Sequence, residues 1–433
     1  MQVLPHSRGA PSSSPSAAPA NDACAPRALL VREPVVDRHG QPCGWAFDTA
    51  PGEAVGLDAA GAGLAAPILA ELAEAAEVDA PPCRSMLIVR ASPLQIESEA
   101  VELLDARRTV LRLDMDHGGS PPPRALLDRV ARLHAAGLRF ALDEAALADG
   151  TSLLLSCTAY VCVDAGRLEP HAAPPRHGAL RRHGARLLAT GVHTPERFAA
   201  ALRAGFDLFQ GRHVTAAPAG PVRTLTPSQA AVLRALALAQ ADAPVSRIDE
   251  ALKSDAALPF RLLRLINSAA FCGRAPVRTL SDAVSRLGYR RLSCWLGVML
   301  TSALGPGGAP PALARVALAR ARLMELLPYD AAEAFDTDER FLAGLLSLLD
   351  AMLQVPLARA LAQLPLSEPL REALLHRAGT LGALLRMVEL CEQMDALDAL
   401  QCWPSGSGAP DLHAVNVAQR DALDWAERAG GHA

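Results

Sequence analysis

Asp255 to Thr301 reads DAALPFRLLRLINSAAFCGRAPVRTLSDAVSRLGYRRLSCWLGVMLT, and this stretch decides the architecture of the second half of the chain. Leucines recur at helical spacing before and after one small-residue junction, NSAAF at residues 267–271. Thr279 followed by Asp282 resembles a capping box, and Gly288 is placed as a helix stop. The stretch has no histidine and no cluster of carboxylates, which indicates a region that binds partners and performs no chemistry.

The composition is that of a folded chain with two domains. Its 433 residues exceed one ordinary core, and 50% of them are apolar. Basic side chains number 42 and acidic ones 46, which leaves no field to attract nucleic acid or an anionic membrane surface. Lys253 is the only lysine and follows no Gly-rich loop, so a P-loop is excluded. We expect no nucleic-acid partner.

Cysteine usage and hydropathy predict a cytoplasmic chain without a membrane segment. The nine cysteines are scattered and never in CxxC spacing, which is typical of free thiols in a reducing compartment. Residues 292–314 carry no charge, but the glycines and prolines at 305–311 would break a membrane helix. The Pro-, Ser- and Ala-rich start predicts a disordered tail rather than a secretory signal.

The two halves differ in period. From about Arg27 to His213, short β-type runs alternate with helical ones, as at 109–113, 124–134 and 138–142. This order predicts a parallel sheet closed by helices, either a barrel or an open sheet. Beyond it only helical patterns occur, among them 311–327, 341–352 and 370 to about 400. We predict a disordered tail at 1–26, an α/β domain at 27–214, a linker at 215–227 and an all-α domain at 228–428.

The second half resembles the HDOD family. The resemblance rests on LLRLINSAAF at 262–271, Pro276-Val277 and AVSRLG at 283–288, and it covers about residues 222–425. Its motif positions are Asn267, Ser268, Phe271 and Gly288. HDOD modules are signalling domains that resemble HD-type metal phosphohydrolases without the metal ligands. Where those hydrolases place a His-Asp pair, this chain has Ser347 and Leu348.

Two readings of the polar residues in this half stay open. Asn267 and Ser268 either satisfy backbone groups at a tight helix crossing, which we favour, or contact a ligand. Arg290 and Arg291 either lie at a solvated helix start, which we favour, or form a DNA-facing edge.

The first half resembles a degenerate, shortened EAL domain. In active members this modified β/α barrel hydrolyses cyclic di-GMP with divalent metal ions. Five parts carry the resemblance, and they are 32–37 with 44–45 (the opening strand pair), 89–93 (VNLSP), 142–144 (LDD), 161–164 (KID) and 189–194 with 210–211 (AEGVET and QG).

The departures from the EAL pattern fall on functional positions. By this resemblance Ala46 replaces a metal-binding Glu, Arg90 replaces a ligand Asn, and Cys162 replaces the Lys that contacts the attacking water. AEGVET has glutamates where this chain has Thr190 and His193. Asp143 and Gln210 match, Asp114 shortens a Glu and Glu144 lengthens an Asp. Loss of hard ligands predicts that metal-assisted hydrolysis fails.

Three alternatives remain at this barrel mouth. Asp114, Asp143, Glu144 and Asp164, with His117 and His193, could build a rewired metal site, although such carboxylates commonly pair with arginines such as Arg90. Arg90 could face the phosphate of a nucleotide that is bound without turnover. Cys162 could be a nucleophile, although we favour a core position.

Together these residues predict that the chain is not an enzyme but a signalling scaffold or adaptor. It would act through protein–protein contacts of its HDOD domain, without cofactor or metal, and its candidate docking faces are the groove near 267–278 and the barrel mouth. Two alternatives are a cyclic di-GMP sensor without turnover and a residual metal-dependent cyclic di-GMP phosphodiesterase.

Overall fold

The computed structural model describes residues 29–50, 85–115, 122–144, 152–167, 184–216, 224–255, 257–267, 277–302, 311–327, 336–394 and 412–430. The predicted tail at 1–26 and the motif positions His117, Ser268 and Phe271 lie outside these ranges. Within the part of the chain that is described, every helix is too short or too polar to cross a membrane.

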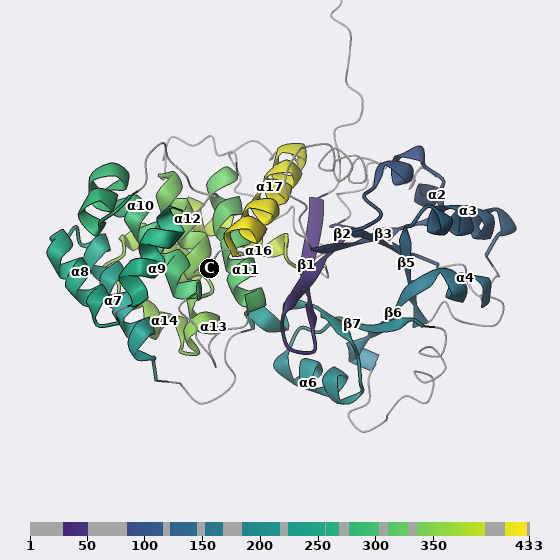
Figure 1. Cartoon of the computed structure of the whole chain (residues 1–433), viewed down its shortest axis with the longest axis horizontal. Helices are drawn as coiled ribbons and strands as arrows, with labels where there is room; N and C mark the ends of the chain where they lie inside the picture. Colours follow the sequence, from purple (N-terminus) through teal and green to yellow (C-terminus); the bar gives the residue numbers. More distant parts are fainter. Residues whose placement is uncertain are drawn as a thin grey trace, which may run out of the picture.

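The first half forms a closed eight-stranded barrel (Figure 1). Its strands are β1 (Leu29–Asp37), β2 (Pro42–Ala50), β3 (Met86–Ala91), β4 (Thr109–Leu113), β5 (Arg139–Asp143), β6 (Thr158–Asp164), β7 (Arg186–Thr190) and β8 (Leu208–Gln210). Strands β2 to β8 pair in parallel, whereas β1 runs antiparallel to both β2 and β8. Of the two sheet forms predicted, the barrel is correct.

Helices cover the outside of the barrel between strands. They are α2 (Pro93–Ile96), η2 (Glu99–Leu103), α3 (Arg124–Ala135), α4 (Ser152–Cys157), η4 (Ala165–Arg167), α6 (Pro195–Arg203) and η5 (Arg212–Thr215). The apolar face of α3, with Leu126, Val130 and Leu133, packs on outward-facing strand residues such as Leu111 and Phe140. The alternate strand positions point inward and form a separate core.

The second half is all-helical in its described parts, which confirms the predicted fold class. Its helices are α7 (Pro227–Gln240), α8 (Val245–Lys253), α9 (Ala257–Ile266), α10 (Leu280–Ser302), α11 (Pro311–Leu326), α12 (Thr337–Leu346), α13 (Leu349–Leu353), α14 (Leu357–Leu361), α15 (Glu368–His376), α16 (Gly379–Leu390) and α17 (Leu412–Gly430).

Two breaks shape these helices. Gly288 has φ 76° and ψ 170°, so α10 bends there, as the predicted stop followed by a new helix requires. The single helix predicted at 341–352 is wrong, because Ser347 and Leu348 separate α12 from α13. Ser347 bonds back to the carbonyl of Gly344 at 2.7 Å, a local bond that ends the helix.

The barrel and the helices share one continuous apolar core where β1 meets α11 and α17 (Figure 1). The backbone of Leu30 forms two bonds to α17, accepting from Gln419 Nε2 at 2.8 Å and donating to Asn416 Oδ1 at 2.9 Å. The side chain of Arg32 also donates to Gln419. The edge of the barrel is therefore fixed to the helical half.

Candidate functional site

The candidate site lies at the carboxyl edge of the barrel. On strands β2 to β8 a residue of the inner core, such as Ile88, Val110 or Ala141, is followed two positions later by a side chain on the same face, and on the antiparallel β1 Glu33 precedes the inner-core Val35 by two positions. This alternation brings one side chain from every strand to the mouth, and they are Glu33, Asp48, Arg90, Arg112, Asp143, Asp164, Thr190 and Gln210. Six of these eight side chains are acidic or basic.

Arg90 bridges two aspartates. Its Nη1 donates to Asp48 Oδ2 at 3.1 Å, and its Nε lies 3.6 Å from Asp114 Oδ2. The side chain of Arg90 is 39% exposed and that of Asp114 is 42% exposed. Arg90, which by the family resemblance stands in place of a ligand asparagine, thus pairs with two carboxylates. The sequence analysis named such pairing as the common state of carboxylates at strand ends.

Arg112 holds the carboxylate of Asp143. Its Nη2 and Nε donate to Asp143 Oδ1 at 2.6 and 3.0 Å. Below this pair, burial raises the pKa of Cys162 to about 12, so its thiol stays protonated. Cys162 is therefore a core residue here, and a nucleophilic role has no support. Glu144 follows Asp143 at the end of β5 and is partly buried.

Glu33 is a mouth residue that the sequence analysis missed. It stands beside Ala46 in the β1–β2 register, so a carboxylate lies next to the position that lacks one. Gln210 Nε2 donates to Glu33 Oε2 at 3.0 Å, and His193 Nδ1 lies 3.7 Å from Glu33 Oε1. The alternation of Glu33 with the inward-facing Val35 was the available signal.

Asp164 and Thr190 end their strands close to this group. Asp164 Oδ1 accepts a bond from the backbone of Gly166 at 2.8 Å, and Asp164 Oδ2 lies 3.7 Å from Arg167. Thr190 is buried and pairs with Asp164 in the parallel register of β6 and β7. Asp164 thus caps its own turn.

The arrangement does not fit the divalent metal ions of active EAL domains. Asp48, Asp114 and Asp143 each pair with an arginine, which already neutralises the carboxylate charge that a divalent metal ion would need. Among the described residues no three side chains of His, Cys, Asp or Glu gather into one group that could hold a metal. The roles predicted for these positions by the family resemblance stay predictions.

The described HDOD motif residues have structural contacts. Asn267 Nδ2 donates to the carbonyls of Leu263 and Val277 at 2.8 and 2.7 Å, and its Oδ1 accepts from the amide of Val277 at 2.7 Å. Asn267 therefore joins the end of α9 to the chain before α10. Arg290 pairs with Asp336 at 2.7 Å and is 75% exposed, whereas Arg291 pairs with Asp338 at 2.6 Å and is 34% exposed.

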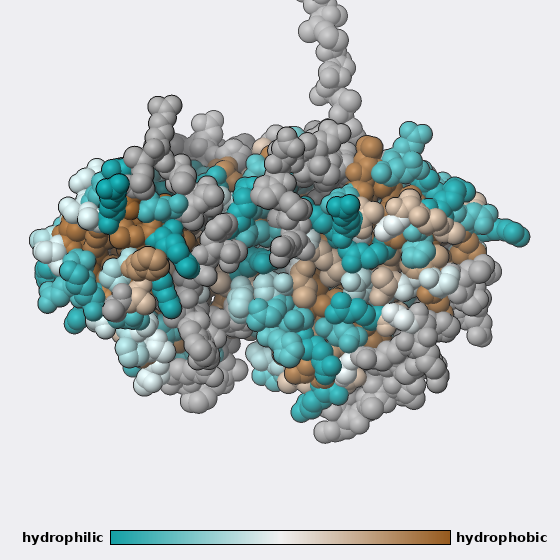
Figure 2. All heavy atoms as spheres, in the orientation of Figure 1, coloured by the Kyte–Doolittle hydropathy of each residue, from teal (hydrophilic) through white to brown (hydrophobic). Residues whose placement is uncertain are grey.

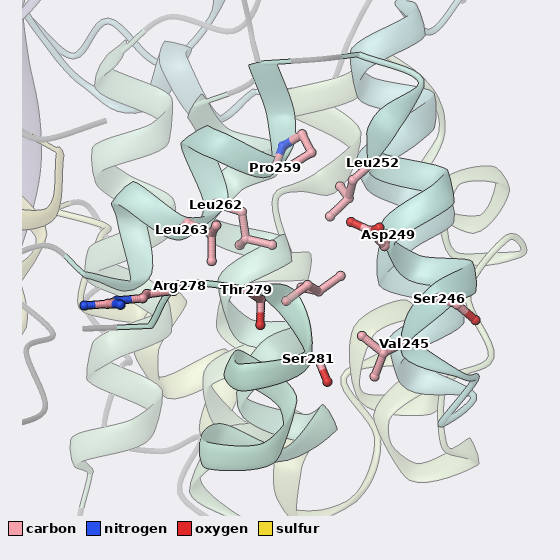
Figure 3. Close-up of a pocket in the computed structure, with 11 residues that line it drawn as sticks. Val245, Ser246, Asp249, Leu252, Pro259, Leu262, Leu263, Arg278, Thr279 and Ser281 are labelled. Carbon is pink, nitrogen blue, oxygen red and sulfur yellow. The ribbon is translucent and has the colours of Figure 1, made fainter. Parts of the chain in front are cut away.

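A groove of about 560 Å³ opens beside this junction, between α8, α9 and the start of α10 (Figure 3). Apolar side chains gather on this part of the helical half (Figure 2). Leu252, Leu262 and Leu280 line the groove, while Asp249 and Arg278 mark its edges. Of the predicted docking face at 267–278, Arg278 lines this groove, and residues 268–276 lie outside the described ranges.

Ser347, which stands where HD-type hydrolases have a histidine, accepts a bond from Arg320. The Nη1 atom of Arg320 donates to Ser347 Oγ at 2.8 Å, and its Nε and Nη2 donate to Glu392 at 3.1 and 2.5 Å. A buried guanidinium thus lies beside this position. Glu389 Oε1 is 3.4 Å from the same arginine.

Comparisons with known proteins agree with the two-part arrangement. The HDOD domain family matches residues 225–364. A curated protein of Vibrio cholerae, named Cyclic di-GMP phosphodiesterase CdgJ, is 26% identical over 277 residues, which are 63% of this chain and 64% of CdgJ. The chain therefore covers a little less than two thirds of that relative.

Solved EAL domains resemble the barrel part of the chain. The EAL domain of Mycobacterium smegmatis DcpA is 20% identical, with a TM-score of 0.31 over 42% of this chain and 87% of that one. Bacillus subtilis YkuI, solved with cyclic di-GMP and calcium, is 18% identical, with a TM-score of 0.35 over 44% of this chain and 54% of that one.

The prediction that this chain is not an enzyme is wrong by this comparison. A relative named a cyclic di-GMP phosphodiesterase matches along 63% of the chain, which points toward an enzyme, although at 26% identity. The prediction rested on residues such as Ala46, Arg90 and Cys162, whereas Glu33 places a carboxylate beside Ala46 in the β1–β2 register. The chain thus has a closed eight-stranded barrel in its first half, and the HDOD domain family matches residues 225–364 of its helical half.

Proposed function

We propose that this chain is a cyclic di-GMP signalling protein whose barrel mouth binds the nucleotide and whose HDOD domain contacts a protein partner. The observation that carries the proposal is Arg90, a partly exposed guanidinium that projects from β3 into the mouth. The relation to a protein named for cyclic di-GMP supports the choice of ligand. Guanidinium groups bind phosphate oxygens through paired N–H donors.

Arg90 can exchange a partner at small cost. Its contact with Asp114 is 3.6 Å long, and both side chains are about 40% exposed. Exposed ion pairs contribute about 0–1 kcal/mol, so a phosphate can replace this aspartate without a large loss. The shorter bond to Asp48 then keeps the guanidinium in place.

Protein contacts are assigned to the groove between α8, α9 and α10. Its leucine-lined wall suits the apolar face of a partner helix. A cytoplasmic location is also part of the proposal, and the scattered cysteines support it. The predicted domain boundaries are proposed as well.

Arg90→Ala is expected to weaken binding of cyclic di-GMP by about 10- to 100-fold, because hydrogen bonds to charged groups contribute about 1.5–3 kcal/mol. Calorimetry on the full chain measures the dissociation constant. Arg107→Ala is the matched control, since Arg107 is exposed just before β4, at the opposite end of the barrel. No heat of binding with the unmodified chain, or equal affinity in the Arg90 variant, would refute the proposal.

Hydrolysis of cyclic di-GMP is a second candidate function, favoured by the 3.7 Å approach of His193 to Glu33. A carboxylate beside an imidazole orients the ring and stabilises the imidazolium that forms when the neutral histidine takes a proton from water as a general base.

His193→Gln is then expected to lower kcat by about 100-fold or more, within the usual contribution of a general base, while the affinity changes little. Chromatographic detection of the linear product measures turnover. His39→Gln, on the exposed turn between β1 and β2, is the control. Equal turnover in the His193 variant would remove the imidazole from this role.

A further inference from the structure

The chain that leaves α16 lies across the barrel mouth. Met394 Sδ is 3.1 Å from Gln210 Nε2, the same nitrogen that donates to Glu33. Met394 packs both on the inner core of the barrel and on the core shared with the helices. A thioether is a weak acceptor and a flexible apolar group, so this contact is easily exchanged for a stronger one.

The position of residues 391–394, the segment that follows α16, depends on how far β1 and β8 pair with each other. Strand β8 pairs with β1 from Val35 to Asp37, and the amide of Gly211, the residue after β8, donates to the carbonyl of Pro34 at 3.2 Å. The amide of Arg32 donates to the carbonyl of Cys391, at 2.7 Å. The residues after α16 therefore continue the barrel wall where β8 ends, and Met394 follows from there to the mouth.

Charge contacts fix the base of the segment inside the helical half. Glu392 accepts both bonds of the Arg320 fork, and its Oε1 lies 3.7 Å from Arg32 Nη2. All three side chains are buried. Because Glu392 is two residues before Met394, any rearrangement of α11 or α16 moves the residue at the mouth.

We propose that Met394 is an autoinhibitory cap, by which the helical half limits access to the nucleotide site of the barrel. The inference rests on the proposed function, because it assumes that cyclic di-GMP binds at this mouth. Ligand that reaches Gln210 and Glu33 must displace Met394, so the affinity of the mouth depends on the fraction of molecules in which the cap has moved. By reciprocity, ligand at the mouth loosens the segment that follows α16.

Calorimetry with the full chain tests the cap. Met394→Ala is expected to bind cyclic di-GMP about tenfold more tightly than the unmodified chain. Loss of the Met394 contact destabilises the state in which the mouth is covered, so that a larger fraction of molecules has an accessible mouth. Gln393→Ala, the neighbouring half-buried position, is the control and is expected to leave the affinity unchanged. Equal or weaker binding by the Met394 variant would overturn the inference.

Hydrogen exchange separates this inference from the proposed function, because it needs no ligand. If Met394 holds the seam closed, Met394→Ala speeds exchange of the Arg32 amide, which bonds to Cys391, and Gln393→Ala does not. If exchange of the Arg32 amide is faster in Met394→Ala but no variant binds the nucleotide, the proposed ligand is refuted and the role of Met394 as a cap is supported. Unchanged exchange in the Met394 variant would refute the cap, whatever the nucleotide does.

Discussion

Arg320→Ala is expected to lower the free energy of unfolding by about 3–5 kcal/mol, because removing one partner of a buried ion pair leaves an uncompensated charge. Arg320 bonds Glu392 through two nitrogens and also contacts Glu389 and Ser347. Burial alone lowers the pKa of Arg320, but the attraction of Glu392 and Glu389 outweighs it and raises the pKa. Without the arginine, Glu392 stays buried with only the longer contact to Arg32.

Urea denaturation followed by circular dichroism measures this loss. Arg290→Ala is the matched control, because Arg290 pairs with Asp336 at 2.7 Å but is 75% exposed, and such pairs contribute at most about 1 kcal/mol. The double variant Arg320→Met with Glu392→Met is expected to recover part of the loss, since apolar pairs often replace buried ion pairs without cost. A loss below about 1 kcal/mol in Arg320→Ala would mean that the cluster does not hold these helices together.

The strands and helices could be predicted because local periodicity specifies them. The run at 109–113 alternates with helix-like runs, and the structure places β4 at those residues. The prediction of one continuous helix at 341–352 was wrong because leucines at helical spacing continue across Ser347. The helix nevertheless ends there, where the side chain of Ser347 bonds to the carbonyl of Gly344. Periodicity reports buried faces and does not report a single turn of this kind.

The candidate site could be predicted only in part. Which strand ends meet at the mouth follows from the barrel order, and the family resemblance located Arg90, Asp143 and Gln210. Contacts between the two halves could not be predicted from local patterns, because they join residues far apart in the sequence. Leu30 and Asn416 are 386 residues apart, and Gln210 and Met394 are 184 apart. Nothing in the local pattern around Met394 distinguishes it from an ordinary residue after a helix.

Gly344→Ala is expected to destabilise the helical half by about 1–3 kcal/mol, which is typical of an extra methyl group forced into a packed core. A Cβ at this position would lie 2.7 Å from the Cα of Ala321 and 2.8 Å from the carbonyl oxygen of Arg320. These are backbone atoms of α11, so α12 must move away from α11. In an unconstrained helix the same substitution stabilises by about 1 kcal/mol, so the expected sign is opposite to that of helix propensity.

Gly297→Ala, at the crossing of α10 with α12, is the control. A Cβ there would lie 2.5 Å from Cδ2 of Leu345, the far end of a flexible side chain, so rotation of Leu345 relieves the contact and the loss is smaller. Urea denaturation compares the two variants. Because the carbonyl of Arg320 faces Gly344 while its guanidinium holds Glu392, separating α11 from α12 also shifts the base of the Met394 segment. Gly344→Ala should therefore speed exchange of the Arg32 amide as well. If the variant is destabilised but its Arg32 amide exchanges at the unchanged rate, the crossing of α11 with α12 is not coupled to the barrel mouth.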